Sequence, residues 1–450
     1  MFKRVLIANR GEIALRIMRA CQEMGIETVC VYSTADKDAP YLKLADRAIC
    51  IGPGPAKESY LNIARIIAAA EIADVDAIHP GYGFLSERPD FSAACRDCKI
   101  EFIGPSPEAM QMLGDKVDCK KTARAAGVPV FPGSEDAIED EDEAVKVAAS
   151  IGYPVIIKAS AGGGGRGMKV CHNEATLRSM LRVASQEAQA AFGNGAVFIE
   201  KYLELARHVE IQMLGDKHGN AVYLWERDCS MQRRHQKVIE EAPAPHVDRA
   251  RLEKVCEAAA KMIRNAKYAG AATCEFLLDG KGDFYMLEVN TRVQVEHPVT
   301  ELITGIDIVK MSIRIAAGEK IPFAQRDITI RGHAIECRIN AEDPDKNFRP
   351  SAGRIDLWQP PGGPGVRLDS HVVPGYVVPP NYDSMIAKLI VHADTRQEAL
   401  DRAARALREF KVGPIKTVIP LHQRLIENTD FRRGGVDIHY LERLLKPGER

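Results

Sequence analysis

The residues best suited to do chemistry lie in the segment 288–296, where polar and apolar residues alternate strictly. Successive side chains of an extended strand point to opposite faces, so the polar residues would share one face. The alternation is also typical of a half-exposed strand with a solvated polar face, but such a face uses Lys, Thr and Ser freely. Two carboxylates, two amides and one guanidinium instead indicate a site for a metal and an anion. These residues are Glu288, Asn290, Arg292, Gln294 and Glu296.

Another carboxylate, Glu275, lies upstream on the apolar segment 274–278. The turn-forming residues 279–283 would fold the chain back as a hairpin and make Glu275 a near neighbour of Glu288. Two such carboxylates repel each other unless a cation lies between them. Hard oxygen ligands combined with an amide favour Mg²⁺ or Mn²⁺ over softer metals. A metal there would neutralise the charge that develops during phosphoryl transfer.

A glycine-rich loop, residues 161–167, lies between two short predicted strands. Its backbone can turn tightly and present N–H groups to phosphate oxygens. The loop satisfies GxGxxG, but that dinucleotide-binding motif must open a helix, and here a strand follows. We therefore favour a glycine flap over ATP, with a plain flexible hairpin as the alternative. Lys158 and Lys116 are candidates to neutralise the phosphates, although most lysines are simply solvated.

The segment 227–237 concentrates basic and imidazole side chains. No aromatic residue interleaves them, so we interpret the segment as an anion site rather than a nucleic-acid surface. The whole chain is also nearly neutral, with 61 Lys and Arg against 62 Asp and Glu, which argues against nucleic-acid or membrane partners. No apolar run is long enough to span a membrane.

Cysteine usage predicts a reducing, cytoplasmic compartment. The 11 cysteines are scattered, and the N-terminal residues read as a strand rather than a signal peptide. Cys95 and Cys98 form a lone CxxC without a second pair at metal spacing, so we expect them to be packing or surface residues.

Several packed units must position these residues, because 450 residues exceed what one hydrophobic core usually spans. The first unit alternates strands (5–8, 28–32) with a helix, which is typical of a parallel sheet, and ends near residue 115. The second contains strands around the glycine loop, an acidic exposed connection at 134–143 and a helix near 248–267. The third begins near residue 332 with an extended segment, 333–340. The predicted class is mixed α/β.

Together these motifs resemble the biotin carboxylase family, the ATP-grasp subunits of biotin-dependent carboxylases. The matching segments are 9–14 (NRGEIA), 79–87 (HPGYGFLSE), the glycine loop, 227–237, 288–298 and 336–338 (ECR). The resemblance implies a Rossmann-like N-terminal domain (1–115) and a central ATP-grasp domain (116–331) whose mobile lid spans about 131–203. A C-terminal biotin carboxylase domain (332–450) would complete the site.

The resemblance also implies roles for individual residues. ATP would contact Lys116, Lys158, Gly164, Gly165, Glu200, Lys201, Tyr202, Leu203, His208, His235, Glu275 and Glu288. The metal would be bound by Glu275, Glu288 and Asn290, and bicarbonate by Lys237, Arg292, Gln294 and the Val295 backbone. Biotin would lie against Tyr82, Gly83 and Arg338, with His235 also near its pocket. Lys237, Arg292, Glu296 and Arg338 would form the catalytic set, with Glu296 as general base and Arg338 stabilising the biotin enolate.

The implied reaction is the ATP- and Mg²⁺-dependent carboxylation of biotin with bicarbonate, through carboxyphosphate. Biotin would be carried by a separate biotin carboxyl carrier protein, alongside carboxyltransferase subunits, and the chain would form a homodimer. The parent enzyme would be an acetyl-CoA carboxylase that makes malonyl-CoA for fatty acid synthesis, or else a pyruvate or other acyl-CoA carboxylase.

Two alternatives belong to other functional classes. A different ATP-grasp ligase, joining a carboxylate to an amine, would need neither Arg338 nor the Glu296 base. A nucleotide-binding regulatory module without turnover would show a broken set of site residues.

Overall fold

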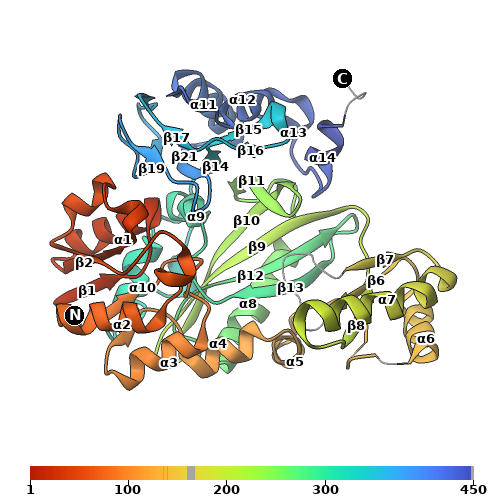
Figure 1. Ribbon diagram of the computed structural model, residues 1–450. Helices are drawn as coiled ribbons and strands as arrows, with labels where there is room; N and C mark the ends of the chain where they lie inside the picture. The colour runs from red at the N-terminus through yellow and green to blue at the C-terminus, as the bar shows by residue number, and fades with distance from the viewer. Residues whose placement is uncertain (135, 139, 160–167, 447–450) are drawn as a thin grey trace.

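The computed structural model describes residues 1–134, 136–138, 140–159 and 168–446. The predicted glycine loop, with Gly164 and Gly165, therefore lies outside the described residues. Figure 1 shows the first elements at the lower left, the elements after residue 332 at the top, and the elements around residues 141–201 at the right. Among the described helices, none is both long and apolar enough to cross a membrane.

A parallel five-stranded sheet, in the order β3-β2-β1-β4-β5, begins the chain. Val5 and Ile7 pack in one core and Leu6 in another, so both faces of the sheet are covered, as parallel sheets require. The predicted alternation of strand and helix is confirmed. The elements are β1 (Arg4–Ile7), α1 (Gly11–Glu23), β2 (Glu27–Tyr32), β3 (Arg47–Cys50), α2 (Ile63–Ala73), β4 (Ala77–His79), α3 (Pro89–Asp97), β5 (Glu101–Phe102) and α4 (Pro107–Gly114).

Two loops meet at the carboxyl ends of the adjacent strands β1 and β4. The side-chain amide of Asn9, which follows β1, donates to the carbonyls of Pro80 and Tyr82, which follow β4, both at 2.7 Å. The strand order changes direction between β1 and β4, and ligands of open α/β sheets bind in the crevice at such a switch point. The NRGEIA and HPGYGFLSE segments are thereby brought together.

An antiparallel eight-stranded sheet forms the centre of the molecule, in the order β13-β12-β9-β10-β11-β14-β21-β19. Strand β11 pairs with β14, so the sheet continues across residue 332, where we expected a new unit to begin. Helix α8 (Arg249–Asn265) packs against β9 and β10. The strands are β9 (Ala206–Gly215), β10 (Ala221–Arg233), β11 (Gln236–Ala242), β12 (Gly270–Asp279), β13 (Phe284–Asn290), β14 (His333–Asn340), β19 (Val366–Ser370) and β21 (Met385–Ala393).

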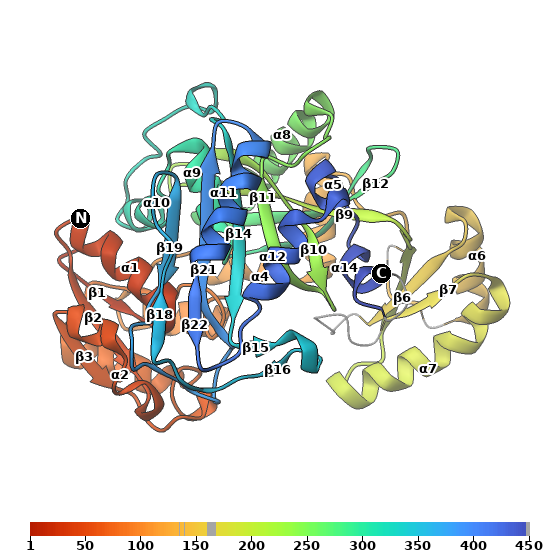
Figure 2. The ribbon, with the colours of Figure 1, turned by 90° about the horizontal axis from the view of Figure 1, so that it is seen from above.

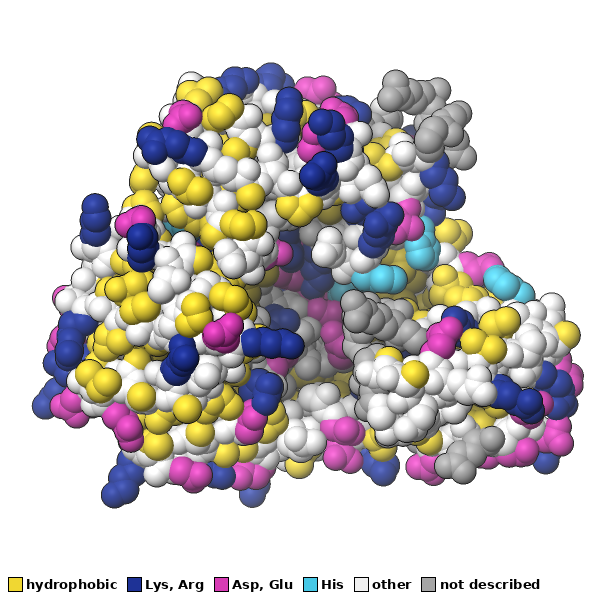
Figure 3. All heavy atoms as spheres, viewed as in Figure 1, with side chains coloured by type: hydrophobic (Ala, Val, Ile, Leu, Met, Phe, Trp, Pro, Cys, Tyr) yellow, Lys and Arg dark blue, Asp and Glu magenta, His cyan; other side chains and the backbone are white. Residues whose placement is uncertain are grey.

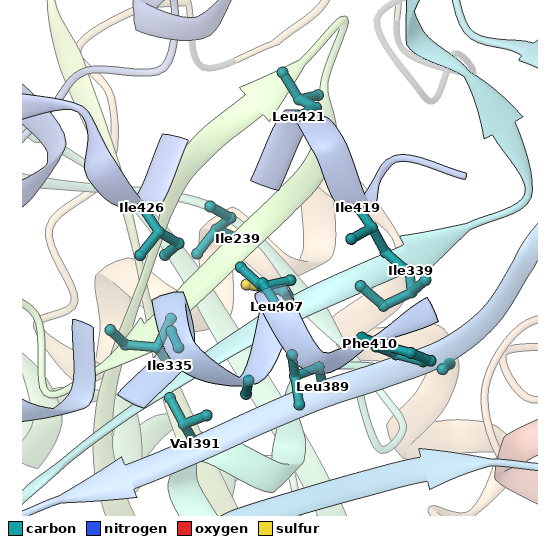
Figure 4. Close-up of a cluster of buried hydrophobic side chains, with 14 of the residues drawn as sticks. Ile239, Ile335, Ile339, Leu389, Val391, Leu407, Phe410, Ile419, Leu421 and Ile426 are labelled. Carbon is teal, nitrogen blue, oxygen red and sulfur yellow. The ribbon is translucent and has the colours of Figure 1, made fainter. Parts of the chain in front are cut away.

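Helices α11 (Arg396–Glu409) and α12 (Ile419–Glu427) cover the C-terminal end of this sheet. Figure 4 shows their apolar side chains gathered against Ile335 and Ile339 of β14 and Leu389 of β21. The other elements of this region are β15 (Glu342–Asp343), β16 (Arg349–Pro350), β17 (Gly353–Arg354), β18 (Leu357–Gln359), β20 (Val377–Val378), β22 (Lys411–Gly413), α13 (Thr429–Arg433) and α14 (Tyr440–Leu444). Short 3-10 helices span Thr34–Asp36, Pro40–Leu44, Ala56–Glu58, Gln325–Asp327 and Pro344–Lys346.

A separate three-stranded sheet, in the order β7-β6-β8, lies apart at the right of Figure 2. It has its own apolar core with two helices. The predicted exposed connection at 134–143 is wrong at its end, because helix α6 begins at Glu141. Asp140 caps that helix by accepting from the Glu143 N–H, and three acidic residues in its first turn favour the helix dipole. The elements are α6 (Glu141–Ile151), β6 (Val155–Ala159), β7 (Lys169–Cys171), α7 (Glu174–Phe192) and β8 (Val197–Lys201).

Three further helices connect these parts. Helix α5 (Lys116–Ala126) ends as predicted at Gly127, whose φ of 86° suits glycine. Helices α9 (His297–Thr304) and α10 (Ile308–Ala316) follow the segment 288–296 and lie between the first sheet and the central sheet. The start of α9 therefore determines where that segment must end.

Candidate active site

One cavity of about 1130 Å³ is lined by residues of all these parts. Figure 3 shows the molecule hollowed here, with acidic and basic side chains inside. Every described residue to which the resemblance assigns a role lines this cavity. They are Tyr82, Gly83, Lys116, Lys158, Glu200, Lys201, Tyr202, Leu203, His208, His235, Lys237, Glu275, Glu288, Asn290, Arg292, Gln294, Val295, Glu296 and Arg338.

Glu275 and Glu288 lie directly opposite each other on the paired strands β12 and β13, as the predicted hairpin required. The side-chain amide of Asn290 donates to Glu275 Oε1 at 2.9 Å. Enclosure by the protein and the negative charge of Glu275 raise the pKa of Glu288. A cation between the two carboxylates would relieve this repulsion, so the oxygen-rich set fits Mg²⁺ or Mn²⁺.

The prediction of one extended face along 288–296 is wrong beyond Asn290, where β13 ends. The Thr291 N–H donates to Glu87 Oε1 at 3.1 Å, and Glu296 is the N-cap residue of α9. The chain therefore turns. The polar side chains are nevertheless brought together, because the Gln294 side-chain amide reaches back to donate to Glu275 Oε1 at 2.7 Å.

Lys237 is the central cation of the site. Its Nζ lies 2.6 Å from Glu210 Oε2, 2.5 Å from Glu296 Oε1 and 3.1 Å from Glu275 Oε1. Burial would lower the pKa of Lys237, but these three carboxylates raise it well above its usual value. Lys237 therefore stays charged between the predicted metal ligands and Glu296.

Glu210 was missed by sequence reasoning. It is fully buried on β9 and also pairs with Arg227, whose Nε lies 2.6 Å from Glu210 Oε1. A signal was present, because His208, Glu210 and Gln212 alternate with apolar residues just as the 288–296 segment does.

Arg338 of β14 lies on the other side of Glu296. Its Nη2 donates to Glu296 Oε2 at 3.0 Å, and its Nε donates to Glu240 Oε1 at 2.5 Å. Burial raises the pKa of Glu296, but Lys237, Arg338 and Arg227 lower it far more, so this carboxylate is ionised. Burial raises the pKa of Glu240 to about 7 despite Arg338. Glu240, another missed residue, thus holds Arg338 from behind.

Arg292 is held from the first sheet. Its Nε donates to Glu87 Oε2 at 3.0 Å, and its Nη2 donates to Asn290 Oδ1 at 2.8 Å. Glu87 ends the HPGYGFLSE segment, yet its role as a partner of Arg292 was not predicted. Two segments more than 200 positions apart in the sequence, |i−j| = 205, meet here.

Tyr82, on the same side of the cavity, donates its hydroxyl hydrogen to Glu12 Oε1. Gly83 has a φ of 69°, a conformation that favours glycine in this turn.

The three-stranded sheet contributes a further charged cluster. Lys158 Nζ lies 2.5 Å from Glu200 Oε2, and Lys120 pairs with Glu200 Oε1. Burial would raise the pKa of Glu200, but the two lysines lower it. Lys201 turns away and donates to the carbonyls of Gly152 and Tyr153, each at 3.0 Å. Lys120 was missed because nothing in its local sequence distinguishes it from a solvated lysine.

His208, Lys116 and His235 border the same space. His208 Nε2 lies 3.1 Å from Glu275 Oε2, and although burial lowers the pKa of His208, Glu275 raises it above its usual value. Burial lowers the pKa of Lys116. His235 lies in the β10–β11 turn with a φ of 63°.

The arrangement can hold a hard cation beside Glu275 and Glu288, and a small anion near Lys237 and Arg292. Glu296 is ionised and lies beside both places, so it can accept a proton from a bound anion.

Three family models together match most of the chain. The "Biotin carboxylase, N-terminal domain" model matches residues 1–110. The "Carbamoyl-phosphate synthase L chain, ATP binding domain" model matches residues 115–324. The "Biotin carboxylase C-terminal domain" model matches residues 336–443.

Curated relatives match over their whole or nearly whole length. The "Biotin carboxylase" of Haemophilus influenzae is 56% identical over 450 residues, which cover 100% of both chains. A pyruvate carboxylase subunit of Methanothermobacter thermautotrophicus is 51% identical over 98% of this chain and 90% of the relative.

Solved structures share the fold closely. A biotin carboxylase from Campylobacter jejuni, described as a complex with beta-gamma-ATP, has a TM-score of 0.94 and 51% identity over 98% of this chain and 99% of that chain. The biotin carboxylase domain dimer of 2-oxoglutarate carboxylase from Hydrogenobacter thermophilus, described with MgADP, ADP and bicarbonate, has a TM-score of 0.92 and 48% identity over 98% of both chains.

Proposed function

The chain belongs to the biotin carboxylase family, and from this premise we propose that it carboxylates biotin on a separate carrier protein, with bicarbonate as the carbon source and ATP as the energy source. One observation carries the proposal. Glu296 is ionised between Lys237 and Arg338, and it lies next to the paired carboxylates Glu275 and Glu288. A base, an anion site and a cation site are thus adjacent.

The bicarbonate step would use the loop after β13. Lys237, Arg292, Gln294 and the Val295 backbone would hold bicarbonate, and Glu296 would take its proton as its oxygen attacks the γ-phosphorus of ATP. ADP leaves and carboxyphosphate forms. Removal of the proton makes the bicarbonate oxygen a better nucleophile, and a base held at hydrogen-bonding distance gives its full effect.

The nucleotide would lie between the three-stranded sheet and the central sheet. Lys116, Lys158, Gly164, Gly165 and His208 would contact its phosphates, and Glu200, Lys201, Tyr202 and Leu203 would surround its base. His235 would complete the contacts with ATP. Glu275, Glu288 and Asn290 would hold Mg²⁺ or Mn²⁺, which supplies positive charge to the phosphate oxygens. Glu200 would then exchange its contacts with Lys158 and Lys120 for the nucleotide.

The biotin step would use the opposite side of Glu296. Carboxyphosphate breaks down to CO₂ and phosphate in the closed site, and this phosphate removes the N1′ proton of biotin. Arg338 would stabilise the enolate that results, because its guanidinium is permanently charged and planar. The N1′ nitrogen then bonds to the carbon of CO₂. Tyr82 and Gly83 would border the ureido ring.

We further propose a division into an N-terminal domain (1–115), an ATP-grasp domain (116–331) and a C-terminal domain (332–450). The segment 131–203 would be the mobile lid, and its separate apolar core supports this view. The β11–β14 pair indicates that the last two domains share one sheet.

A homodimer in the cytoplasm, working with a biotin carboxyl carrier protein and carboxyltransferase subunits, is the assembly we propose. The Haemophilus relative, which this chain spans completely, favours a role in an acetyl-CoA carboxylase that supplies malonyl-CoA for fatty acid synthesis. The Methanothermobacter relative favours the same role in a pyruvate carboxylase. Identification of the carboxyltransferase that co-purifies with the chain would distinguish the two.

The deciding experiment measures ATP hydrolysis with bicarbonate and Mg²⁺, with and without free biotin. We expect bicarbonate-dependent hydrolysis that biotin stimulates, and Arg338→Ala should abolish the stimulation while the variant still binds ATP. The proposal is wrong if biotin has no effect on the wild-type rate and Arg338→Ala leaves it unaltered.

A further inference from the structure

Lys388 has no assigned role, although its position is unusual. It lies on β21, its side chain is 0% exposed, and it is among the largest fully buried side chains of the described chain. Lysine is almost never fully buried unless it is paired. Across the sheet, Lys388 lies opposite Arg338 of β14 on one side and Asp369 of β19 on the other.

The Lys388 ammonium contacts three separate parts of the molecule. Its Nζ donates to the Val295 carbonyl at 2.9 Å and lies 3.2 Å from Glu12 Oε2 of α1. Asp369 Oδ2 is farther away, at 3.8 Å. Burial would lower the pKa of Lys388, but Glu12, Glu336 and Asp369 raise it, so the ammonium keeps its three donors.

Simple charge neutralisation does not account for this geometry. Asp369 already has a partner, because Arg367 donates to its two carboxylate oxygens at 2.9 and 2.7 Å. The shortest contact of Lys388 Nζ is with a neutral carbonyl rather than with a carboxylate. The lysine is therefore directed at the backbone of the loop after β13.

We propose that Lys388 is a positioning residue, which fixes the peptide unit between Val295 and Glu296 and links it through Glu12 to Tyr82. The inference rests on the proposed function, from which the roles of Val295, Glu296 and Tyr82 are taken. A peptide unit is planar, so holding the Val295 carbonyl also fixes the nitrogen of Glu296. Lys388 thus sets the backbone that contacts bicarbonate and the residue that deprotonates it.

The link to the biotin side runs through one carboxylate. Glu12 is buried, its Oε1 accepts from the Tyr82 hydroxyl, and its Oε2 pairs with Lys388. The bicarbonate loop and the proposed biotin pocket are therefore connected by a chain of three side chains that belong to the first and last parts of the sequence.

Lys388→Met tests the proposal, with Asp369→Asn as the matched control. Lys388→Met removes the donor to Val295, whereas Asp369→Asn removes a charge from the same cluster without touching the loop. For Lys388→Met we expect about a 100-fold lower kcat for bicarbonate-dependent ATP hydrolysis and a higher KM for bicarbonate, with the KM for ATP within about twofold, because misplacing reacting groups by about 1 Å costs this much. For Asp369→Asn we expect a kcat within about threefold of wild type at a similar melting temperature.

Hydrogen exchange measured by mass spectrometry gives a readout that does not depend on activity. Peptides that cover residues 291–297 should exchange faster in Lys388→Met, while those of β14 and β21 stay protected. If the wild type lacks bicarbonate-dependent hydrolysis, the proposed function fails, whereas unchanged exchange at 291–297 overturns the inference about Lys388 itself. Equal losses of kcat in Lys388→Met and Asp369→Asn overturn it as well.

A second variant serves if Lys388→Met fails to fold. The double variant Glu12→Gln/Lys388→Met removes both charges of the pair and leaves no unpaired buried charge between them, which proteins often tolerate well. It lacks the same donor, so the same loss of kcat and the same faster exchange are expected. Glu12→Gln alone should keep the bicarbonate KM and raise the biotin KM, and wild-type behaviour of the double variant contradicts the proposal.

Discussion

Glu275 and Glu288 lie on paired strands, whereas Arg292, Gln294 and Glu296 follow the end of β13 and lie in a loop. The first pair is placed by the hydrogen-bond register of β12 and β13. The loop residues are placed by side chains from distant parts of the chain, including Glu87, Lys237 and Arg338. The strand half should therefore be insensitive to changes elsewhere, while the loop half should depend on its partners.

Loss of the Glu296 carboxylate should have the largest effect on activity. For Glu296→Gln we expect kcat for bicarbonate-dependent ATP hydrolysis to fall by about 1000-fold, because a positioned general base contributes on the order of 10² to 10⁴. The KM for ATP should change little, because the strand half is intact. Steady-state kinetics at varied ATP and bicarbonate measures both quantities. A large rise in the KM for ATP at wild-type kcat would assign Glu296 to the strand half instead.

Glu288→Gln should instead affect the strand half. We expect the Mg²⁺ concentration for half-maximal rate to rise about 10- to 100-fold, which is the range for perturbed metal sites. The KM for bicarbonate at saturating Mg²⁺ should stay close to that of the wild type. Titration of Mg²⁺ at fixed ATP checks this, and an unchanged Mg²⁺ requirement would contradict the metal assignment.

Glu87→Gln should weaken the loop half from a distance. Arg292 loses a charged partner, but the Glu87 side chain is 40% exposed, so the effect is moderate. We expect about a fivefold rise in the KM for bicarbonate, at the lower end for a hydrogen bond to a charged group, with Mg²⁺ and ATP dependence unchanged. Asp90→Asn is the control, since Asp90 pairs with Arg88 in a nearby exposed ion pair that does not contact the loop. Equal effects of the two variants would remove the special role of Glu87.

Glu241→Gln should leave both halves intact and act on the scaffold alone. Glu241 accepts from His333 at 2.8 Å and from Arg396 at 2.6 and 3.0 Å. Burial would raise the pKa of Glu241, but these two partners lower it from 4.5 to about 2. Because the folded pKa lies below the unfolded one, this carboxylate stabilises the fold above pH 4.5, and the contribution is lost as the pH falls toward 2.

At pH 7 the contribution corresponds to about 3 kcal/mol of unfolding free energy. Urea unfolding of the wild type and Glu241→Gln between pH 7 and 3 should give a stability difference that shrinks with falling pH, with activity at pH 7 within about twofold. A difference that does not depend on pH would show that the carboxylate charge is not what stabilises the sheet.

Local sequence patterns predicted the local structure well. The hairpin that joins Glu275 to Glu288, helix α5 with its glycine end and strand β14 all follow from nearby residues. The prediction failed for α6, whose acidic first turn resembles an exposed connection although Asp140 makes it a capped helix. It also failed beyond Asn290, because the alternation continues after the strand has ended at the edge of its sheet.

Partners from distant segments could not be predicted. A charged residue within an apolar strand, such as Glu210, Glu240 or Lys388, indicates a buried polar contact. The identity of the partner depends on which strands become neighbours, and one sequence does not encode the order β9-β10-β11-β14-β21 locally. The set of site residues was therefore within reach of the sequence, while the residues that hold them in place were not.

The continuity of the central sheet has a consequence for how the molecule unfolds. Strand β14 is bonded on one side to β11 and on the other to β21, so residues 206–393 cannot melt in two independent steps. A fragment cut near residue 331 would expose two unsatisfied strand edges, which favour aggregation. The three-stranded sheet has no such bond to the central sheet in its strand order. It can therefore form the one subdomain that opens locally while the remainder stays cooperative.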